Sequence, residues 1–169
     1  KNPSYSFKWV HNSFGTNFRM TEIQAAIGRN QLKMFNLWHS IRKRNADFLT
    51  KQLSDLHLLR IPIVPKHIEH AWYKFTIYLN LDVLAAGWNR ERILNEIRKE
   101  GYPALSGSCS EIYLEKCFKD IGISPSAPLP IAKELGDTSL TFLIHPTISI
   151  EEIQNYSSKI REVILKATR

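Results

Sequence analysis

A short loop near the start of the chain carries side chains that suit an anionic ligand. Gly15 permits backbone conformations that other residues avoid, Asn17 offers an uncharged amide, and Arg19 offers a forked cation that matches phosphate or carboxylate. Thr21 and Gln24 have the spacing of a capping box, which predicts that a helix begins directly after the loop. Because helix N-termini favour anions, the loop is a candidate phosphate site. The alternative is a structural loop with a solvated arginine.

A second polar loop, residues 106–111, reads Ser-Gly-Ser-Cys-Ser-Glu. Its short hydroxyl-bearing side chains suit sugar hydroxyls or phosphate oxygens, and a tight surface loop is the alternative. The candidate binding residues are Ser106, Ser108 and Ser110. Cys109 and His145 would form a nucleophile–base pair only within hydrogen-bond reach, and the sequence shows no such proximity. We therefore expect His145 to be a strand-end residue.

The composition indicates one domain, or one domain and part of another, with enough apolar residues for a core. The chain has 169 residues, 43% of them hydrophobic, and a net charge of +7. The charge suggests an anionic partner, either nucleic acid or a nucleoside-diphosphate sugar, and a merely solvated basic surface is the alternative. Cys109 and Cys117 have neither zinc-type spacing nor a disulfide framework, which fits a reducing compartment.

No apolar run is long enough to cross a bilayer, and no signal peptide is visible. The first residue is Lys1, and we expect the chain to be a fragment of a longer protein. The basic run Arg42-Lys43-Arg44 lies on a predicted helix, where a solvated face is expected. A nucleic-acid patch is disfavoured because no helix-turn-helix, zinc-finger or RNA-binding motif accompanies the run.

A long helix is predicted to position the first loop. Hydrophobic residues recur at helical spacing from Ile23 and Ile27 through Phe48 and Leu49. A helix of about 33 residues at ~1.5 Å each is about 50 Å long, which exceeds the needs of a small domain. We therefore expect this helix to bend or to link two structural units.

A small sheet is predicted after the long helix. Residues 55–70 indicate a connecting loop with two prolines. The alternation of Tyr73, Phe75, Ile77 and Leu79 predicts a strand over 72–80 with one buried side. Further strands are expected over 102–106 and 139–145.

Three shorter helices complete the prediction. Helices are expected over 89–100, over 130–135 with an end at Gly136, and from a capping box at Ser149 to about residue 167. This order predicts an α/β fold with an α+β-like small domain. It consists of a long N-terminal linking helix and a small, mostly antiparallel sheet of about three strands covered by helices.

Three stretches of the chain resemble one enzyme family. Residues 15–28 read Gly-Thr-Asn-Phe-Arg-Met-Thr-Glu-Ile-Gln-Ala-Ala-Ile-Gly, residues 106–116 read Ser-Gly-Ser-Cys-Ser-Glu-Ile-Tyr-Leu-Glu-Lys, and residues 134–147 read Glu-Leu-Gly-Asp-Thr-Ser-Leu-Thr-Phe-Leu-Ile-His-Pro-Thr. In this order they resemble the C-terminal part of the sugar-nucleotide aminotransferases of the DegT/DnrJ type, which are fold-type I, pyridoxal-phosphate enzymes.

The resemblance implies a domain arrangement. Residues 1–20 would be the tail of the large cofactor domain, 21–54 the linking helix, and 55–169 the C-terminal small domain. The cofactor lysine would lie upstream of Lys1, so no catalytic residue is expected in this chain. Lys74 has no local acid or aromatic cover of the kind that a cofactor lysine needs, so we expect it to reach solvent from a strand.

The resemblance also implies roles for the two loops. Asn17, with Gly15, would bind the phosphate of pyridoxal 5'-phosphate in the active site of the neighbouring subunit. Arg19 would lie near the substrate phosphates, and the serines of the second loop would face the substrate. The enzyme would be a cytoplasmic homodimer with shared active sites that involves no metal, nucleic acid or membrane.

The implied reaction is amino transfer, with glutamate the usual donor, to a nucleoside-diphosphate keto sugar for polysaccharide, lipopolysaccharide or related amino-sugar biosynthesis. Many relatives carry a His-Tyr pair in the region of residues 106–111, and its absence here leaves the sugar open. The fragment alone is expected to be inactive. The alternatives are a non-catalytic binding or oligomerisation domain with a basic face for nucleic acid or an acidic partner, and a relative that lost its cofactor lysine.

Overall fold

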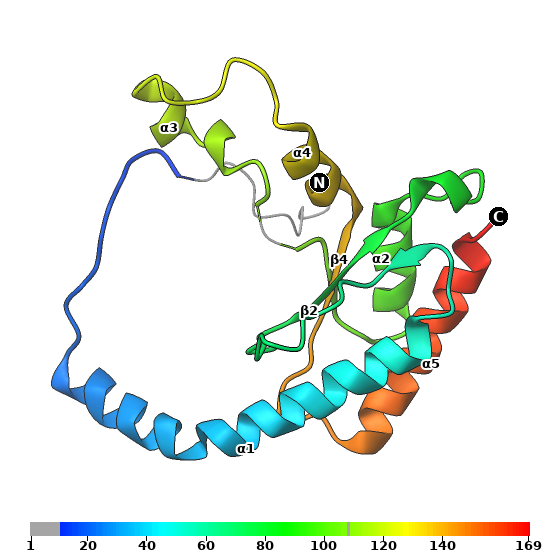
Figure 1. The fold of residues 1–169 in the computed structure, drawn as a ribbon, viewed down its shortest axis with the longest axis horizontal. Helices are drawn as coiled ribbons and strands as arrows, with labels where there is room; N and C mark the ends of the chain where they lie inside the picture. Colours follow the sequence, from blue (N-terminus) through cyan, green and yellow to red (C-terminus); the bar gives the residue numbers. More distant parts are fainter. Residues whose placement is uncertain (1–10, 108) are drawn as a thin grey trace.

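The computed structural model describes residues 11–107 and 109–169, which form helices packed on a small sheet (Figure 1). In chain order the elements are α1 (Glu22–Leu53), β1 (Leu59–Arg60), β2 (Phe75–Leu79), the 3-10 turn η1 (Leu81–Val83), α2 (Arg90–Lys99), β3 (Ala104–Leu105), the 3-10 turn η2 (Ile112–Leu114), α3 (Lys116–Asp120), α4 (Pro130–Thr138), β4 (Ser139–Phe142) and α5 (Ile150–Ala167). The predicted α/β class is confirmed. Among these described helices, none combines the length and apolar character that crossing a bilayer requires.

The sheet is antiparallel and, within the described residues, has four strands in the order β1-β2-β4-β3. β2 and β4 form its centre, with Ile77 opposite Leu140. The strand that the sequence does not predict is β1, which pairs with the end of β2. Its two residues lie inside the predicted connecting loop and are too few to show any alternation.

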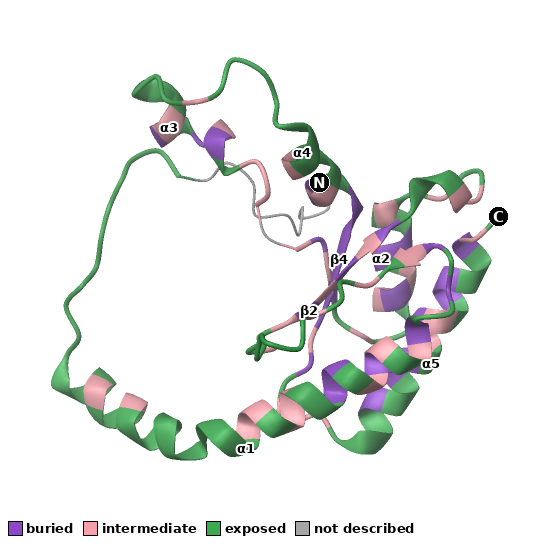
Figure 2. Cartoon of the chain, viewed as in Figure 1, coloured by how far each residue is buried: buried purple, intermediate pink, exposed green. Residues whose placement is uncertain are grey.

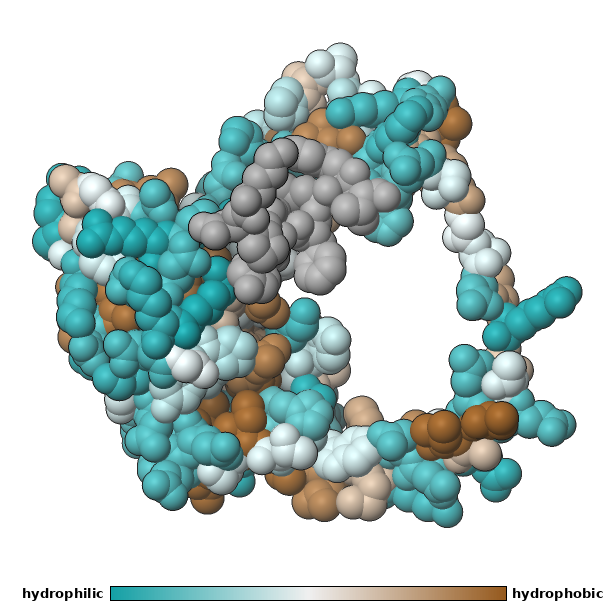
Figure 3. Space-filling view, turned by 180° about the vertical axis from the view of Figure 1, so that it is seen from behind, coloured by the Kyte–Doolittle hydropathy of each residue, from teal (hydrophilic) through white to brown (hydrophobic). Residues whose placement is uncertain are grey.

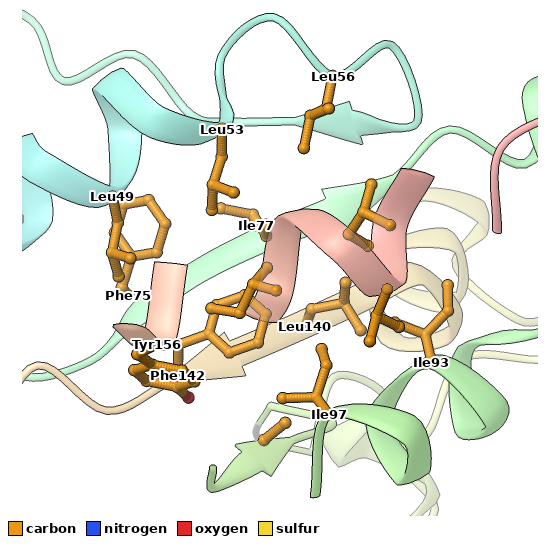
Figure 4. Close-up of a cluster of buried hydrophobic side chains, with 14 of the residues drawn as sticks. Leu49, Leu53, Leu56, Phe75, Ile77, Ile93, Ile97, Leu140, Phe142 and Tyr156 are labelled. Atoms are coloured by element: carbon orange, nitrogen blue, oxygen red, sulfur yellow. The ribbon is translucent and has the colours of Figure 1, made fainter. Parts of the chain in front are cut away.

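One face of the sheet carries the hydrophobic core (Figure 4). β2 buries Phe75, Ile77 and Leu79 and leaves the two residues between them half-buried, which confirms the predicted alternation for these three. The prediction is wrong for Tyr73, which is 73% exposed because the strand begins only at Phe75. The helices α2 and α5 and the C-terminal half of α1 cover this face. Their buried side chains include Leu49, Leu53, Ile93, Ile97, Tyr156 and Ile160. Burial of one large apolar side chain stabilises a fold by ~1.5–3 kcal/mol, so this layer is the main source of stability.

The opposite face of the sheet is partly covered by α4. Ala132 and Leu135 of α4 share the lining of a hollow with Thr76 and Tyr78 of β2. The predicted end of this helix at Gly136 is wrong, because α4 continues to Thr138. Gly136 is buried within the helix, where the absent side chain allows a close approach by a neighbouring loop.

Only the C-terminal half of α1 is packed (Figure 2). Its buried residues are Asn45, Ala46, Leu49 and Leu53. Ile23 and Ile27, at the start of the predicted hydrophobic stripe, are 75% and 56% exposed. The stripe is therefore present in the sequence, but its N-terminal half has no cover from the described part of this chain.

A buried amide joins α1 to the loop that follows β4. Asn45 is fully buried and donates from Nδ2 to the carbonyl of His145 at 3.4 Å. Its Oδ1 accepts from Nε and Nη2 of Arg44 at 3.1 and 2.8 Å. Because a buried amide without partners would be destabilising, these bonds fix the register of α1 against the sheet.

The basic run on α1 is engaged by the protein itself. Arg42 donates to the carbonyl of Tyr73 at 3.0 Å, and Lys43 pairs with Asp47 at 2.6 Å. Arg44 bonds to Asn45 as described. Each of the three cations therefore has a partner within the described residues.

Residues 11–20 form an extended segment, here called the arm, that leads to the N-terminus of α1 (Figure 1). All ten residues are exposed. The arm runs from the neighbourhood of α3 to the far end of α1. In Figure 3 the arm and the N-terminal half of α1 border an open space.

Candidate functional site

The arm holds the first candidate site between two anchored ends. At its start, Phe14 packs edge-on against Phe118 of α3, with ring centroids 5.1 Å apart. At its end, Thr21 caps α1: its Oγ1 accepts from the backbone N–H of Gln24 at 3.3 Å, and its own N–H donates to Gln24 Oε1 at 2.9 Å. The predicted capping box is therefore confirmed. Residues 15–20 bridge two fixed points.

Asn17 and Arg19 project from the middle of this bridge as exposed side chains. Neither has a hydrogen-bond partner among the described residues. A Cβ placed on Gly15 would meet nothing within 4 Å, so the backbone there is open to a ligand. Glu22 in the first turn of α1 offsets part of the positive helix end. The capacity to bind an anion therefore rests on the amide of Asn17 and the guanidinium of Arg19.

The second candidate site, residues 106–111 or the serine loop, is built into the fold at its start. Ser106 is buried, and its carbonyl accepts from Ser139 Oγ at 2.6 Å. Gly107 has a φ of +84°, and a Cβ there would lie 2.9 Å from Ser139 Oγ. Only glycine combines that backbone conformation with that close approach. The serine loop is thus held against β4.

The rest of the serine loop borders a hollow of about 420 Å³ between α4 and the sheet. The hollow is lined by Thr76, Tyr78, Cys109, Ser110, Leu135 and Ser139, among others. Its hydroxyl groups suit a polar ligand. Ser110 packs closely on α4, since a Cβ on Gly136 would lie 1.9 Å from Ser110 Oγ. The third predicted residue, Ser108, lies outside the described residues.

Three residues that sequence reasoning considers and rejects as catalytic are His145, Cys109 and Lys74. His145 is exposed, and its Nδ1 lies 2.8 Å from Thr147 Oγ1 and accepts from the Thr147 N–H at 3.3 Å. Cys109 lines the hollow beside α4. Lys74 places its ammonium 5.3 Å from the centre of the Tyr73 ring. These contacts give no support to a catalytic role for any of the three.

Sequence reasoning misses Glu115, a buried carboxylate directly before α3 that contacts the start of the arm. Glu115 accepts the backbone N–H of His11 at 2.7 Å, and the two residues are 104 positions apart. No local spacing reveals such a pair. The only signal is that Glu115 falls within one of the three stretches that carry the family resemblance.

Comparison with known proteins decides the family. The model of the DegT/DnrJ/EryC1/StrS aminotransferase family matches residues 2–161. The chain belongs to this family. Its aminotransferases depend on pyridoxal phosphate.

Solved and curated relatives match most of this chain. The aminotransferase from Psychrobacter cryohalolentis is 39% identical with a TM-score of 0.83, over 99% of this chain and 44% of that one. The dTDP-4-dehydro-2,6-dideoxy-D-glucose 3-dehydratase of Saccharopolyspora spinosa is 27% identical over 98% of this chain and 35% of that protein. The UDP-N-acetyl-3-dehydro-alpha-D-glucosamine 3-aminotransferase of Acidithiobacillus ferrooxidans is 24% identical over 91% and 38%. The chain thus spans less than half the length of each.

The residues of the arm fit a cofactor phosphate by their chemistry. A phosphate requires hydrogen-bond donors, and the arm offers the amide of Asn17, the guanidinium of Arg19 and exposed backbone around Gly15. These residues are exposed and are not part of the hydrophobic core of this chain. Such donors suit a group held by another part of the assembly.

Proposed function

We propose that the protein containing this chain transfers an amino group, with glutamate as donor, to a keto sugar attached to a nucleoside diphosphate. The family match over residues 2–161 is the observation that carries this proposal. The product would be an amino sugar for polysaccharide or lipopolysaccharide biosynthesis in the cytoplasm. Curated relatives named for dTDP-linked and UDP-linked sugars support the substrate class.

We assign the chain to the C-terminal part of that enzyme. Residues 1–20 would belong to the large cofactor domain, 21–54 to the linking helix and 55–169 to the small domain. The exposed N-terminal half of α1 supports this division, because a half-covered helix suits a connection between two bodies.

The arm would complete the active site of a second subunit. Asn17 and the Gly15 backbone would donate hydrogen bonds to the cofactor phosphate, and Arg19 would attract the substrate phosphates. Pyridoxal phosphate, when bound, supplies the electron sink that amino transfer requires. The serine loop would orient the sugar through Ser106, Ser108 and Ser110, of which Ser110 is half-exposed beside the hollow.

A homodimer follows from this use of the arm. The large apolar side chains left exposed on α1 are Ile23, Ile27, Leu32, Met34, Phe35 and Leu37. Exposed apolar residues gathered on one helix mark an interaction surface. We expect α1 to contact the large domain and the second subunit.

The test is an assay of the full-length protein with isotope-labelled glutamate and nucleotide-linked keto sugars. Mass spectrometry should detect labelled nitrogen in the sugar product. Because one relative is named a dehydratase, the assay also monitors loss of water from the same substrates. Dehydration without nitrogen incorporation would contradict amino transfer. Residues 1–169 alone should produce neither product, and turnover by them would contradict the domain assignment.

The non-catalytic alternative makes a different prediction. A basic domain that binds nucleic acid loses affinity steeply as salt rises. The structure weakens this alternative, because Arg42, Lys43 and Arg44 are engaged by protein groups. A salt titration of the full-length protein with duplex and single-stranded DNA checks it.

A further inference from the structure

Glu115 is a buried carboxylate with 2% of its side chain exposed, a state that carboxylates rarely adopt without a partner. It precedes the first residue of α3 but makes no capping hydrogen bond to that helix. Instead its Oε2 accepts the backbone N–H of His11 at 2.7 Å, and its Oε1 lies 3.3 Å from His11 Nδ1. A hydrogen bond to a buried ionised acceptor is strong and costly to leave unmade.

Two more contacts join the same two segments. The backbone N–H of Cys117 donates to the carbonyl of His11 at 3.4 Å. Phe14 packs edge-on against Phe118. All these contacts fall at the beginning of the arm, directly before Asn17 and Arg19. They fix the point from which those two side chains extend.

The segment that receives the arm is itself held in place. Ser124 Oγ donates to the carbonyl of Tyr113 at 2.6 Å. The Tyr113 hydroxyl donates to Glu111 Oε1 at 2.7 Å and accepts from the backbone N–H of Leu129 at 2.9 Å. Residues 111–118 therefore form a fixed base rather than a free loop, and they continue directly from the serine loop.

We propose that Glu115 is a positioning residue that docks the start of the arm and so sets where Asn17 and Arg19 stand in the site they complete. This inference rests on the proposed function of the arm and deepens it.

The test uses the full-length protein with three variants. Glu115→Leu removes both acceptor oxygens at similar size, whereas Glu115→Gln keeps one oxygen that can accept the His11 N–H. Glu134→Leu, at an exposed acid of α4 that pairs with Arg60 at 3.6 Å, is the matched control. Hydrogen–deuterium exchange of residues 11–20 reports docking, and titration of the apo-protein with pyridoxal phosphate reports affinity.

Of these three variants, Glu115→Leu should show the largest increase in exchange in the arm. If the docked fraction of the arm falls to about one tenth, the apparent dissociation constant of the cofactor rises about tenfold. Glu115→Gln should restore both measurements most of the way. If Glu115 only stabilised α3, its variants would change the melting temperature, but Glu115→Leu and Glu115→Gln would not differ in arm exchange and cofactor affinity.

Three results would overturn the proposal. Unchanged exchange in the arm of Glu115→Leu rules out docking by Glu115, whatever the cofactor affinity. The positioning role is ruled out if Glu115→Leu exchanges faster in the arm but binds pyridoxal phosphate as tightly as the wild type, while Asn17→Ala binds it more weakly. If Asn17→Ala is also without effect, the proposed function of the arm fails together with the positioning role.

If Glu115→Leu fails to fold, Phe118→Ala provides an independent test of docking. This variant keeps the carboxylate and removes the ring that contacts Phe14. It should increase exchange in the arm by a smaller factor. Exchange equal to that of the wild type would count against docking.

Discussion

Arg161 of α5 forms a bidentate ion pair with Asp55, which lies two residues beyond the end of α1. Nη1 lies 2.6 Å from Oδ1 and Nη2 lies 2.5 Å from Oδ2, while Nη1 also donates to the carbonyl of Gln52 at 2.9 Å. This hydrogen-bonded guanidinium lowers the pKa of the Asp55 carboxyl. The pair ties the packed end of α1 to the last helix.

Asp55→Asn should therefore reduce stability near neutral pH. A pKa that is lower in the folded state contributes stability above the ordinary aspartate pKa of about 4, and this is lost as pH falls through the lowered folded value. The difference between wild type and variant should shrink below about pH 4. Urea denaturation at several pH values measures it. Asp47→Asn, which breaks only the Lys43 pair within α1, is the control and should show a smaller difference.

Asn17→Ala in the full-length protein should weaken the binding of pyridoxal phosphate. A hydrogen bond to a charged group contributes ~1.5–3 kcal/mol, which corresponds to about tenfold to a hundredfold in affinity. Titration of the apo-enzyme by absorbance measures the change. Asn36 is exposed on α1, outside the arm, and the control variant Asn36→Ala should bind pyridoxal phosphate as the wild type does. Equal affinities for both variants would remove Asn17 from the site.

Ile27→Glu should favour dissociation of the full-length dimer. Ile27 is 56% exposed in this chain, so the charge is tolerated in the free subunit but must be desolvated in an interface. We expect the dimer dissociation constant to rise by about tenfold or more, measured by analytical ultracentrifugation. Asn36 lies about 180° around the helix from Ile27, so Asn36→Glu tests the opposite side. A similar loss of dimer in both variants would argue against a defined face.

Gly136→Ala should push the serine loop away from α4. The new Cβ would lie 1.9 Å from Ser110 Oγ and 3.0 Å from Ser110 Cβ, so rotation of the hydroxyl alone does not relieve the contact. Overpacking of this kind costs ~1–3 kcal/mol of unfolding free energy. Ser110→Gly in the same protein removes both atoms and should recover most of the loss. Additive effects in this double-mutant cycle would mean that the two residues do not touch.

Local signals in the sequence predict α1, α2, α5 and the central strand correctly. The capping boxes at Thr21 and Ser149 place the first residues of α1 and α5, because the pairing residue lies three positions away. The alternation through Ile77 predicts the buried face of β2 because burial on a strand has a period of two. The loop that carries Asn17 also follows from sequence, since a helix start comes directly after it, whereas its exposure is visible only in the structure.

Features that depend on distant residues are not predictable in this way. β1 forms only because β2 offers an edge, and its two residues carry no pattern of their own. α4 passes through Gly136, where Ser110 occupies the space that a side chain would need. This glycine therefore serves close packing and does not end the helix, a distinction that local sequence does not reveal. The burial of Glu115 is a property of its contact with His11, 104 positions away.

The arm, which borders the open space in Figure 3, is held without a covalent bond at its start, where His11 and Phe14 contact residues 115–118. If a segment of the second subunit lies in this space, opening of this contact gives it a way to enter or leave. A slow step in subunit exchange should therefore be sought at this contact.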